Sequence, residues 1–199
     1  MKIYFVRHGE TDYNAQFLLQ GSSDIPLNKN GIEVAKKEGE KVREAGLTFD
    51  KIYTSQLSRS IDTAMLINNS DDSSFIKDER LAEIGWGPYE GAPYLPMRDI
   101  LGPYFQDYEG ATIEGAEPMR DVAKRVKAAF EDIMKDAKED ENILICAHAI
   151  SLRALLHVLS EGKEESFDKV PLPNAKIYCM ECHDGVLKMP YMVFPDKGE

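Results

Sequence analysis

The chain has 199 residues, of which 43% are hydrophobic and 30% charged, and its formal net charge is −11. A chain of this length can fold as one domain that buries about two-thirds of its unfolded surface, and a strongly acidic surface repels nucleic acid phosphates and anionic lipid headgroups. We therefore expect a globular protein with neither nucleic acid nor membrane partners, although a few converging arginines could still bind a small anion.

The start of the chain predicts a short buried strand that runs into a polar loop. Residues 3–6 are apolar and rich in β-forming types, and Arg7, His8 and Gly9 follow directly. The segment lacks the longer apolar core of a signal peptide, and no apolar run approaches the length of a bilayer span. We expect a cytoplasmic protein.

The next elements alternate between helix and strand. A loop rich in Gly, Ser, Asp and Asn extends to residue 30, and residues 31–45 then show helical spacing of apolar side chains until Gly46. A second strand is expected over residues 51–54, a helix over 57–67 and a third strand over 75–77.

Residues 85–115 predict an irregular lid, because glycine, proline and aromatic residues are frequent there and little regular periodicity is visible. Its large apolar side chains would suit an apolar or ring-bearing leaving group, or would equally pack the lid onto the domain. They are Tyr89, Tyr94, Leu95, Tyr104, Phe105 and Tyr108.

The second half of the chain continues the alternation. The pattern predicts a strongly amphipathic helix over residues 119–137, a very apolar strand over 142–147 and a helix over 151–159. Residues 176–182 and 186–193 form a predicted hairpin around an Asp-Gly turn.

This alternation favours a three-layer α/β/α sandwich over residues 1–199, with a mainly parallel central sheet and a C-terminal hairpin or antiparallel edge strand. In such sheets, ligands bind beyond the carboxyl ends of the strands. Arg7, His8 and His148 all fall at such ends.

The segment Arg7-His8-Gly9-Glu10-Thr11, with Asn14 close behind, contains the groups that bind and attack a phosphate ester. A guanidinium offers a fork of donors to phosphate oxygens, and glycine lets the backbone approach a ligand. An imidazole can serve as a nucleophile or a general base near neutral pH.

This segment resembles the opening motif of the histidine phosphatase superfamily, also called phosphoglycerate-mutase-like. Later blocks resemble the family in the same order and cover nearly the whole chain. They are Gln20-Gly21 with Asp24, Pro26-Leu27 and Gly31; Thr54-Ser55-Gln56-Leu57-Ser58-Arg59 with Thr63-Ala64; Leu81-Ala82-Glu83 with Glu90-Gly91; Ala147-His148 with Arg153-Ala154-Leu155; and Pro173-Asn174-Ala175.

The resemblance implies a role for each matching residue. His8 would accept the phosphoryl group and Glu83 would donate the proton to the leaving group. Arg7, Arg59 and His148 would bind the phosphoryl oxygens, with Asn14 as a supporting donor. Gln20, Gly21 and Ala149 are expected around the phosphate. Two arginines and an imidazole stabilise a phosphoryl group without a metal, so we expect no metal and no cofactor.

The resemblance leaves the reaction and the substrate open. A phosphatase is favoured over a bisphosphoglycerate-dependent phosphoglycerate mutase, because the paired-arginine insertion of the mutases is absent and Arg98 is the only basic residue between Glu90 and Arg120. A non-catalytic module that binds a phosphorylated ligand is a further alternative. The expected partner is a small phosphorylated substrate, and monomer and homodimer both stay open.

Two features depart from these patterns. Ala149 stands where the family usually has glycine, and its methyl group would narrow the floor of the pocket. Cys179 and Cys182 precede His183 with the spacing of a haem attachment site, but the alternation of the segment indicates a hairpin strand instead. With Cys146 they are expected to be free thiols.

Overall fold

The computed structural model describes residues 1–161 and 170–195. Its strands are β1 (Lys2–Arg7), β2 (Lys51–Thr54), β3 (Ile76–Lys77), β4 (Asn142–Ala147), β5 (Ile177–His183), β6 (Val186–Leu187) and β7 (Tyr191–Met192). Its α-helices are α1 (Asp12–Ala15), α2 (Lys29–Glu44), α3 (Ser58–Asn68), α4 (Tyr94–Gln106), α5 (Met119–Asp136) and α6 (Ala149–Leu159), and the short 3₁₀ helices η1 (Glu79–Leu81) and η2 (Gly87–Tyr89) lie between β3 and α4.

The strands form one sheet in the order β3-β2-β4-β1-β5-β6, and β7 pairs with β5. The first four in this order are parallel, whereas β5 lies antiparallel to β1 and both β6 and β7 lie antiparallel to β5. The sheet is thus mainly parallel with antiparallel strands at one edge, as the sequence predicts.

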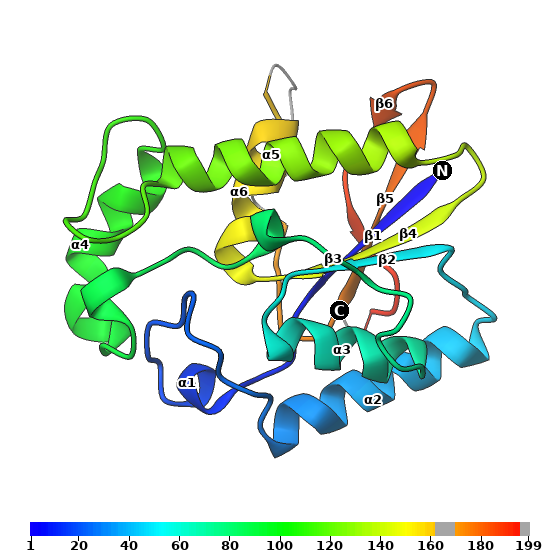
Figure 1. Cartoon of the computed structure of the whole chain (residues 1–199), viewed down its shortest axis with the longest axis horizontal. Coiled ribbons are helices and arrows are strands. Elements are labelled where there is room, and N and C mark those ends of the chain that lie inside the picture. Colours follow the sequence, from blue (N-terminus) through cyan, green and yellow to red (C-terminus); the bar gives the residue numbers. More distant parts are fainter. Residues whose placement is uncertain (162–169, 196–199) are drawn as a thin grey trace.

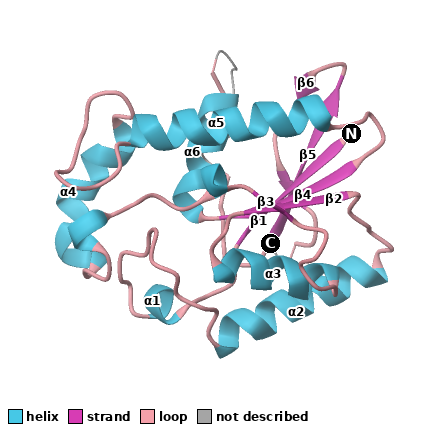
Figure 2. Ribbon diagram, viewed as in Figure 1, coloured by secondary structure: helices cyan, strands magenta, loops and turns pink. Residues whose placement is uncertain are grey.

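Helices cover both faces of the sheet (Figure 1). Helices α5 and α6 lie on one side and α2 and α3 on the other, so the strands form the middle of three layers (Figure 2). One apolar cluster joins α5 and α6 to the sheet through residues such as Val126 and Leu155, and a second joins α2 and α3 through Val42 and Ile67. Burial on both faces explains why the central strands are almost continuously apolar.

The expectation of an irregular segment over residues 85–115 is wrong for its middle, where α4 extends from Tyr94 to Gln106. Leu101 and Tyr104 are buried on one face of this helix, at helical spacing from the half-buried Met97. Pro96 lies in the first turn, where its missing N–H would have no helical partner, whereas Pro103 lies inside the helix and removes one N–H from its last turns.

The ends of other elements differ less from the predictions. Helix α6 begins at Ala149, earlier than expected, and a short helix α1 interrupts the predicted loop. The second strand of the predicted hairpin is divided into β6 and β7 by a segment that contains Pro190, which has no N–H for strand pairing. None of the helices in the described part of the chain has the length and apolar character needed to cross a bilayer.

Candidate active site

The pairing of β1 with β4 brings His8 and His148 together. Arg7 lies opposite Ala147 in the parallel register, so the residue after each strand emerges at the same edge of the sheet. The backbone N–H of His8 donates to the Ala147 carbonyl at 3.0 Å, and the two imidazole rings lie 5.1 Å apart between centroids. The site is therefore built on adjacent strand ends.

His8 is buried with one ring nitrogen in a hydrogen bond. Its Nδ1 lies 2.7 Å from the Gly9 carbonyl oxygen, which can only accept, so Nδ1 carries the proton and Nε2 carries the lone pair. Burial lowers the pKa of His8 well below its usual value, and the charges of Arg59 and Arg7 lower it further. Both observations favour a neutral His8 with the proton on Nδ1 and the lone pair on Nε2.

Arg59 projects from α3 into the protein interior and is completely buried. Its Nη2 donates to the Gly21 carbonyl at 2.7 Å, its Nη1 to the Ser23 carbonyl at 2.8 Å and its Nε to Nδ1 of His148 at 3.2 Å. Burial lowers the pKa of Arg59, although the charge of Glu83 opposes this shift. The guanidinium is held rigidly beside both histidines.

Ser55, the first residue after β2, holds the second histidine. Its Oγ lies 2.7 Å from Nε2 of His148, on the side of the ring opposite the Arg59 bond. Burial lowers the pKa of His148 well below its usual value, and Arg59 adds to this effect. Neither ring nitrogen of His148 lacks a hydrogen-bonding partner, so the ring orientation is fixed.

Glu83 lies against the N-terminus of α6 and is only 6% exposed. Its Oε1 accepts the backbone N–H groups of Ile150 and Ser151 at 3.1 Å each. Burial raises the pKa of Glu83, while the Ile150 N–H and the Arg59 charge act in the opposite direction. The helix N-terminus next to His148 therefore holds the carboxylate of the protein itself.

Arg7, the last residue of β1, and Asn14 in the short helix α1 both line the site. The Nη1 of Arg7 donates to the Leu172 carbonyl at 3.2 Å, and its buried Nε has no hydrogen-bond partner among the described residues. Asn14 Oδ1 accepts the Thr11 N–H at 3.2 Å in a capping box at α1. A buried donor without a partner is costly, so Arg7 presents a group suited to an anion.

Gln20 and Gly21 support Arg59. With its amide oriented to satisfy both neighbours, Gln20 donates to Thr11 Oγ1 at 2.6 Å and accepts from the Arg59 Nη1 at 3.3 Å. Gly21 turns its carbonyl to Arg59, while its N–H donates to Glu90 at 3.1 Å. The structure thus places Gly21 behind the site, where its N–H is not available to a phosphate.

A cavity of about 260 Å³ opens over these residues. The predicted site residues that line it are Arg7, His8, Asn14, Gln20, Glu83 and Ala149. The rest of its wall is apolar or aromatic and consists of Leu18, Leu19, Trp86, Tyr94, Phe105 and Ile150. Arg59 and His148 lie directly behind this lining.

Several of these residues were not identified from the sequence. Ser55 is one, although its position at the end of a predicted strand was a usable signal. Trp86 and Ile150 are others, and only the fold brings them to the cavity. Of the aromatic residues expected in the lid, Tyr94 and Phe105 line the cavity, whereas Tyr104 is buried and Tyr108 stacks on His157 with ring centroids 4.0 Å apart.

The described residues contain no group of three or more His, Cys, Asp or Glu side chains arranged to hold a metal ion. Positive charge at the cavity comes instead from Arg7 on its wall and Arg59 behind it. Fold and site together define an α/β protein with a pocket at the carboxyl edge of its sheet that contains a histidine and an arginine.

The chain belongs to the histidine phosphatase superfamily, branch 1, whose family model matches residues 3–192. Its sequence is 30% identical over 204 aligned residues to the 2,3-bisphosphoglycerate-dependent phosphoglycerate mutase of Bifidobacterium longum, covering 87% of this chain and 83% of that protein.

Solved structures share the fold. Bacillus stearothermophilus YhfR superposes with a TM-score of 0.77 at 26% identity over 94% of both chains. A mycobacterial glucosyl-3-phosphoglycerate phosphatase in complex with VO3 superposes with a TM-score of 0.79 at 22% identity over 96% of both chains. Proteins similar to this chain thus include both phosphatases and phosphoglycerate mutases.

Proposed function

We propose that this protein is a metal-independent phosphatase that hydrolyses a small phosphate monoester through a phosphohistidine on His8. The observation that carries the proposal is the state of His8, whose Nδ1–H is held by the Gly9 carbonyl at 2.7 Å while burial and two arginines keep the ring neutral. A neutral imidazole with a free Nε2 is a nucleophile at physiological pH.

In the first step, Nε2 of His8 attacks phosphorus and the bond to the ester oxygen breaks. Glu83 gives its proton to that oxygen, so that the leaving group departs as an alcohol. The raised pKa of Glu83 favours the protonated form that this step needs. Arg7 and Asn14, which line the cavity, would bind the equatorial oxygens directly. Arg59 adds its positive charge from behind the lining, and His148, whose ring nitrogens are occupied by Arg59 and Ser55, would hold Arg59 in place instead of donating to the phosphoryl group.

In the second step, water attacks the phosphohistidine while the Glu83 carboxylate takes one of its protons. The bond between phosphorus and nitrogen breaks, its electron pair returns to Nε2 of His8, and phosphate leaves. Glu83 is then protonated again and both groups are ready for another cycle.

Hydrolysis is proposed over mutase activity because of the composition of the cavity wall. Arg7 is the only Lys or Arg side chain among the described residues that line the cavity. Arg98 lies on the exposed side of α4, where its Nε is 3.5 Å from Asp99. A phosphoglycerate carboxylate would therefore lack a second cation, whereas an apolar or ring-bearing leaving group matches Trp86, Tyr94 and Phe105.

Phosphate release in excess EDTA tests the proposal, with phosphoglycerate, sugar phosphates, nucleotides and an aryl phosphate as substrates. We expect release that is greatest with the aryl ester and that disappears in His8→Ala. His183→Ala is the matched control, because His183 is the exposed last residue of β5 and does not line the cavity.

Two other outcomes would replace the proposal. Interconversion of phosphoglycerates that requires added bisphosphoglycerate, without net phosphate release, would identify a mutase, as some relatives of this chain are named. Tight phosphate binding with no phosphohistidine formed from any ester would identify a non-catalytic binding module.

A further inference from the structure

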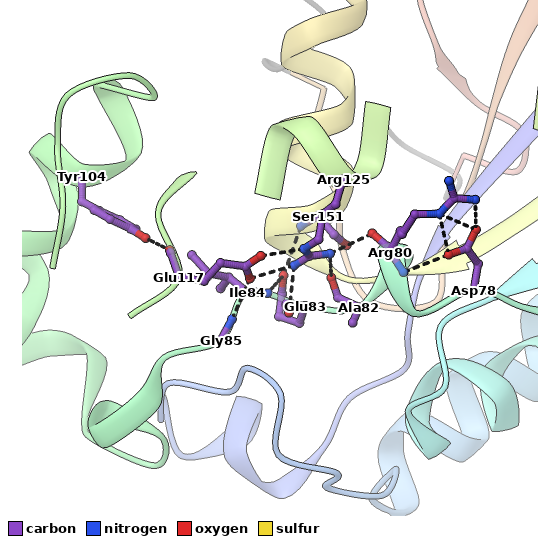
Figure 3. A network of polar contacts seen from close by, with 10 residues as sticks. All are labelled: Asp78, Arg80, Ala82, Glu83, Ile84, Gly85, Tyr104, Glu117, Arg125 and Ser151. Carbon is purple, nitrogen blue, oxygen red and sulfur yellow. Dashed lines mark hydrogen bonds and ion pairs between the residues drawn. The ribbon is translucent and has the colours of Figure 1, made fainter. Parts of the chain in front are cut away.

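Arg125 on α5 binds the backbone of the segment that carries Glu83. Its Nη1 donates to the carbonyls of Arg80 at 2.8 Å and Ala82 at 2.7 Å, and its Nη2 donates to the carbonyl of Glu83 at 3.1 Å. Figure 3 shows the guanidinium inserted among these carbonyls. Residues 82–86 lie between η1 and η2 and outside the sheet, so no strand partner orders them.

Glu117 binds both Arg125 and the backbone of the segment that carries Glu83. It accepts from the Nε of Arg125 at 2.7 Å and from the Nη2 at 3.0 Å, a bidentate pair, and its Oε2 also accepts the Gly85 N–H at 3.1 Å. The Glu117 N–H in turn donates to the Gly85 carbonyl at 2.7 Å. Since a guanidinium has five N–H groups, the donors of Arg125 are fully used by this one segment and its partner.

The same contacts reach the aromatic wall of the cavity. The hydroxyl of Tyr104 on α4 donates to the Glu117 carbonyl (Figure 3). The Tyr104 ring packs against Trp86 and Phe105, with centroids 6.0 Å and 5.7 Å away. Those two rings line the cavity.

Glu83 is consequently held at two groups, its backbone carbonyl and its side-chain carboxylate, by the neighbouring helices α5 and α6. Arg125 holds its carbonyl, while the N–H groups of Ile150 and Ser151 at the start of α6 hold its carboxylate. Helices α5 and α6 pack on each other. A general acid must lie within hydrogen-bonding reach of the oxygen that it protonates, so its backbone cannot be allowed to drift.

We propose that Arg125, paired with Glu117, is the positioning residue for Glu83. It touches no atom of the substrate and acts through the placement of the general acid. This inference rests on the proposed function, because it requires that Glu83 protonates the leaving group.

The test compares two esters in each variant, a simple alkyl phosphate and p-nitrophenyl phosphate. The alkyl ester needs protonation of its leaving oxygen, whereas nitrophenolate leaves without it. Arg125→Lys keeps the charge but cannot bind three carbonyls and a carboxylate together. We expect kcat/KM on the alkyl ester to fall by about tenfold to a hundredfold, as a displaced catalytic group does, and kcat/KM on the aryl ester to fall by less than about threefold. The ratio kcat/KM is compared because it reports the transfer to His8 and not the later hydrolysis, which both esters share.

Two further variants sharpen the comparison. Glu117→Gln keeps an acceptor for Gly85 but weakens the Arg125 pair, and it should show the same selectivity with a smaller loss. Arg80→Lys is the matched control, because the Arg80 side chain bonds Asp78 and Asp132 instead of the Glu83 segment. The ratio of the two rates is measured on one sample, so it does not depend on the fraction of enzyme that is folded.

A double-mutant cycle distinguishes the positioning role of Arg125 from the general-acid role of Glu83. If Arg125 acts through Glu83, then Arg125→Lys adds no loss on the alkyl ester in a Glu83→Gln background. If the losses of activity from Arg125→Lys and Glu83→Gln instead multiply in the double variant, the positioning role is overturned. It is also overturned if Arg125→Lys and Glu117→Gln slow both esters equally while Glu83→Gln slows mainly the alkyl ester. If Glu83→Gln itself lowers kcat/KM equally for both esters, the proposed role of Glu83 as general acid fails, and the inference fails with it.

Discussion

Arg59 donates from its Nε to Nδ1 of His148 at 3.2 Å, and this bond determines which nitrogen of the imidazole carries the proton. A guanidinium only donates, so Nδ1 must supply a lone pair and Nε2 must carry the hydrogen. The Nε2–H then points to Ser55 Oγ at 2.7 Å. Ser55 thus maintains the tautomer and orientation of His148.

Replacing Ser55 by alanine is expected to lower kcat/KM by roughly tenfold, since a buried donor without its acceptor costs about 1–3 kcal/mol. Steady-state kinetics on an aryl phosphate, together with the ¹⁵N shifts of His148, would measure the effect. Ser60→Ala is the control, because Ser60 is equally buried but donates to the Cys146 carbonyl instead. Wild-type kinetics in Ser55→Ala would contradict this role.

Activity should depend on pH through His8 and Glu83 in opposite ways. The pKa of His8 is lowered by burial and by Arg59, so the neutral nucleophile persists into the acid range. Burial raises the pKa of Glu83, and activity is lost as the pH rises through that value because the acid becomes ionised. We therefore expect an acid-shifted optimum of kcat/KM between the two pKa values.

The variant Glu83→Gln identifies the alkaline limb. With the same simple alkyl phosphate as the substrate of both proteins, the leaving oxygen needs the Glu83 proton and ionisation of the ester contributes equally to the two profiles. The alkaline limb should flatten in the variant while the acid limb, which belongs to His8, remains. If the wild type and Glu83→Gln lose activity over the same range at high pH, the alkaline limb belongs to a group other than Glu83.

The central features of the fold and site follow from local sequence patterns. Apolar strands that end in Arg7-His8 and Ala147-His148 predict a parallel sheet with both histidines at one edge, and the register of β1 and β4 explains this placement. These patterns suffice because parallel strands in a three-layer fold are buried on both faces and read as continuous apolar runs.

Other features depend on tertiary contacts that no local pattern encodes. The amides at the start of α6 bind the carboxylate of Glu83, which lies far earlier in the chain. Helix α4 was missed because Pro96, Gly102 and Pro103 obscure its periodicity, although Leu101 and Tyr104 are buried at helical spacing. Arg125 is indistinguishable from a surface arginine until the fold surrounds it with carbonyls.

Removal of an aromatic ring from the cavity wall should change specificity. Phe105 lines the cavity, so Phe105→Ala is expected to raise KM for an aryl phosphate by about twofold to tenfold, the equivalent of the roughly 0.5–1.5 kcal/mol that a pair of contacting rings contributes. KM for a small alkyl phosphate should hardly change. The control is Leu95→Ala, because Leu95 lies on the same helix with 65% of its surface exposed. Equal effects on both esters would place the leaving group elsewhere.

Gly21 is predicted to tolerate no side chain, because its backbone lies directly against the segment that carries the general acid. A methyl group there would overlap the Ile84 carbonyl and the Glu90 carboxylate. Ile84 follows Glu83 in the chain, and the Gly21 carbonyl accepts from Arg59 at 2.7 Å. Relief of the overlap must therefore displace either Glu83 or Arg59.

We expect Gly21→Ala to lower Tm by about 5 °C, since overpacking costs about 1–3 kcal/mol and each kcal/mol shifts Tm by a few degrees in a chain of this size. kcat/KM should fall by at least about tenfold as the acid or the arginine moves.

Gly102→Ala is the matched control, because no atom lies within 4 Å of the added carbon and alanine favours the α4 helix. Thermal unfolding and kinetics of both variants distinguish a rigid contact from an adaptable loop. A Gly21→Ala protein with unchanged Tm and unchanged kcat/KM would show that the loop can withdraw without moving Arg59, which the hydrogen bonds from Arg59 to the Gly21 and Ser23 carbonyls argue against.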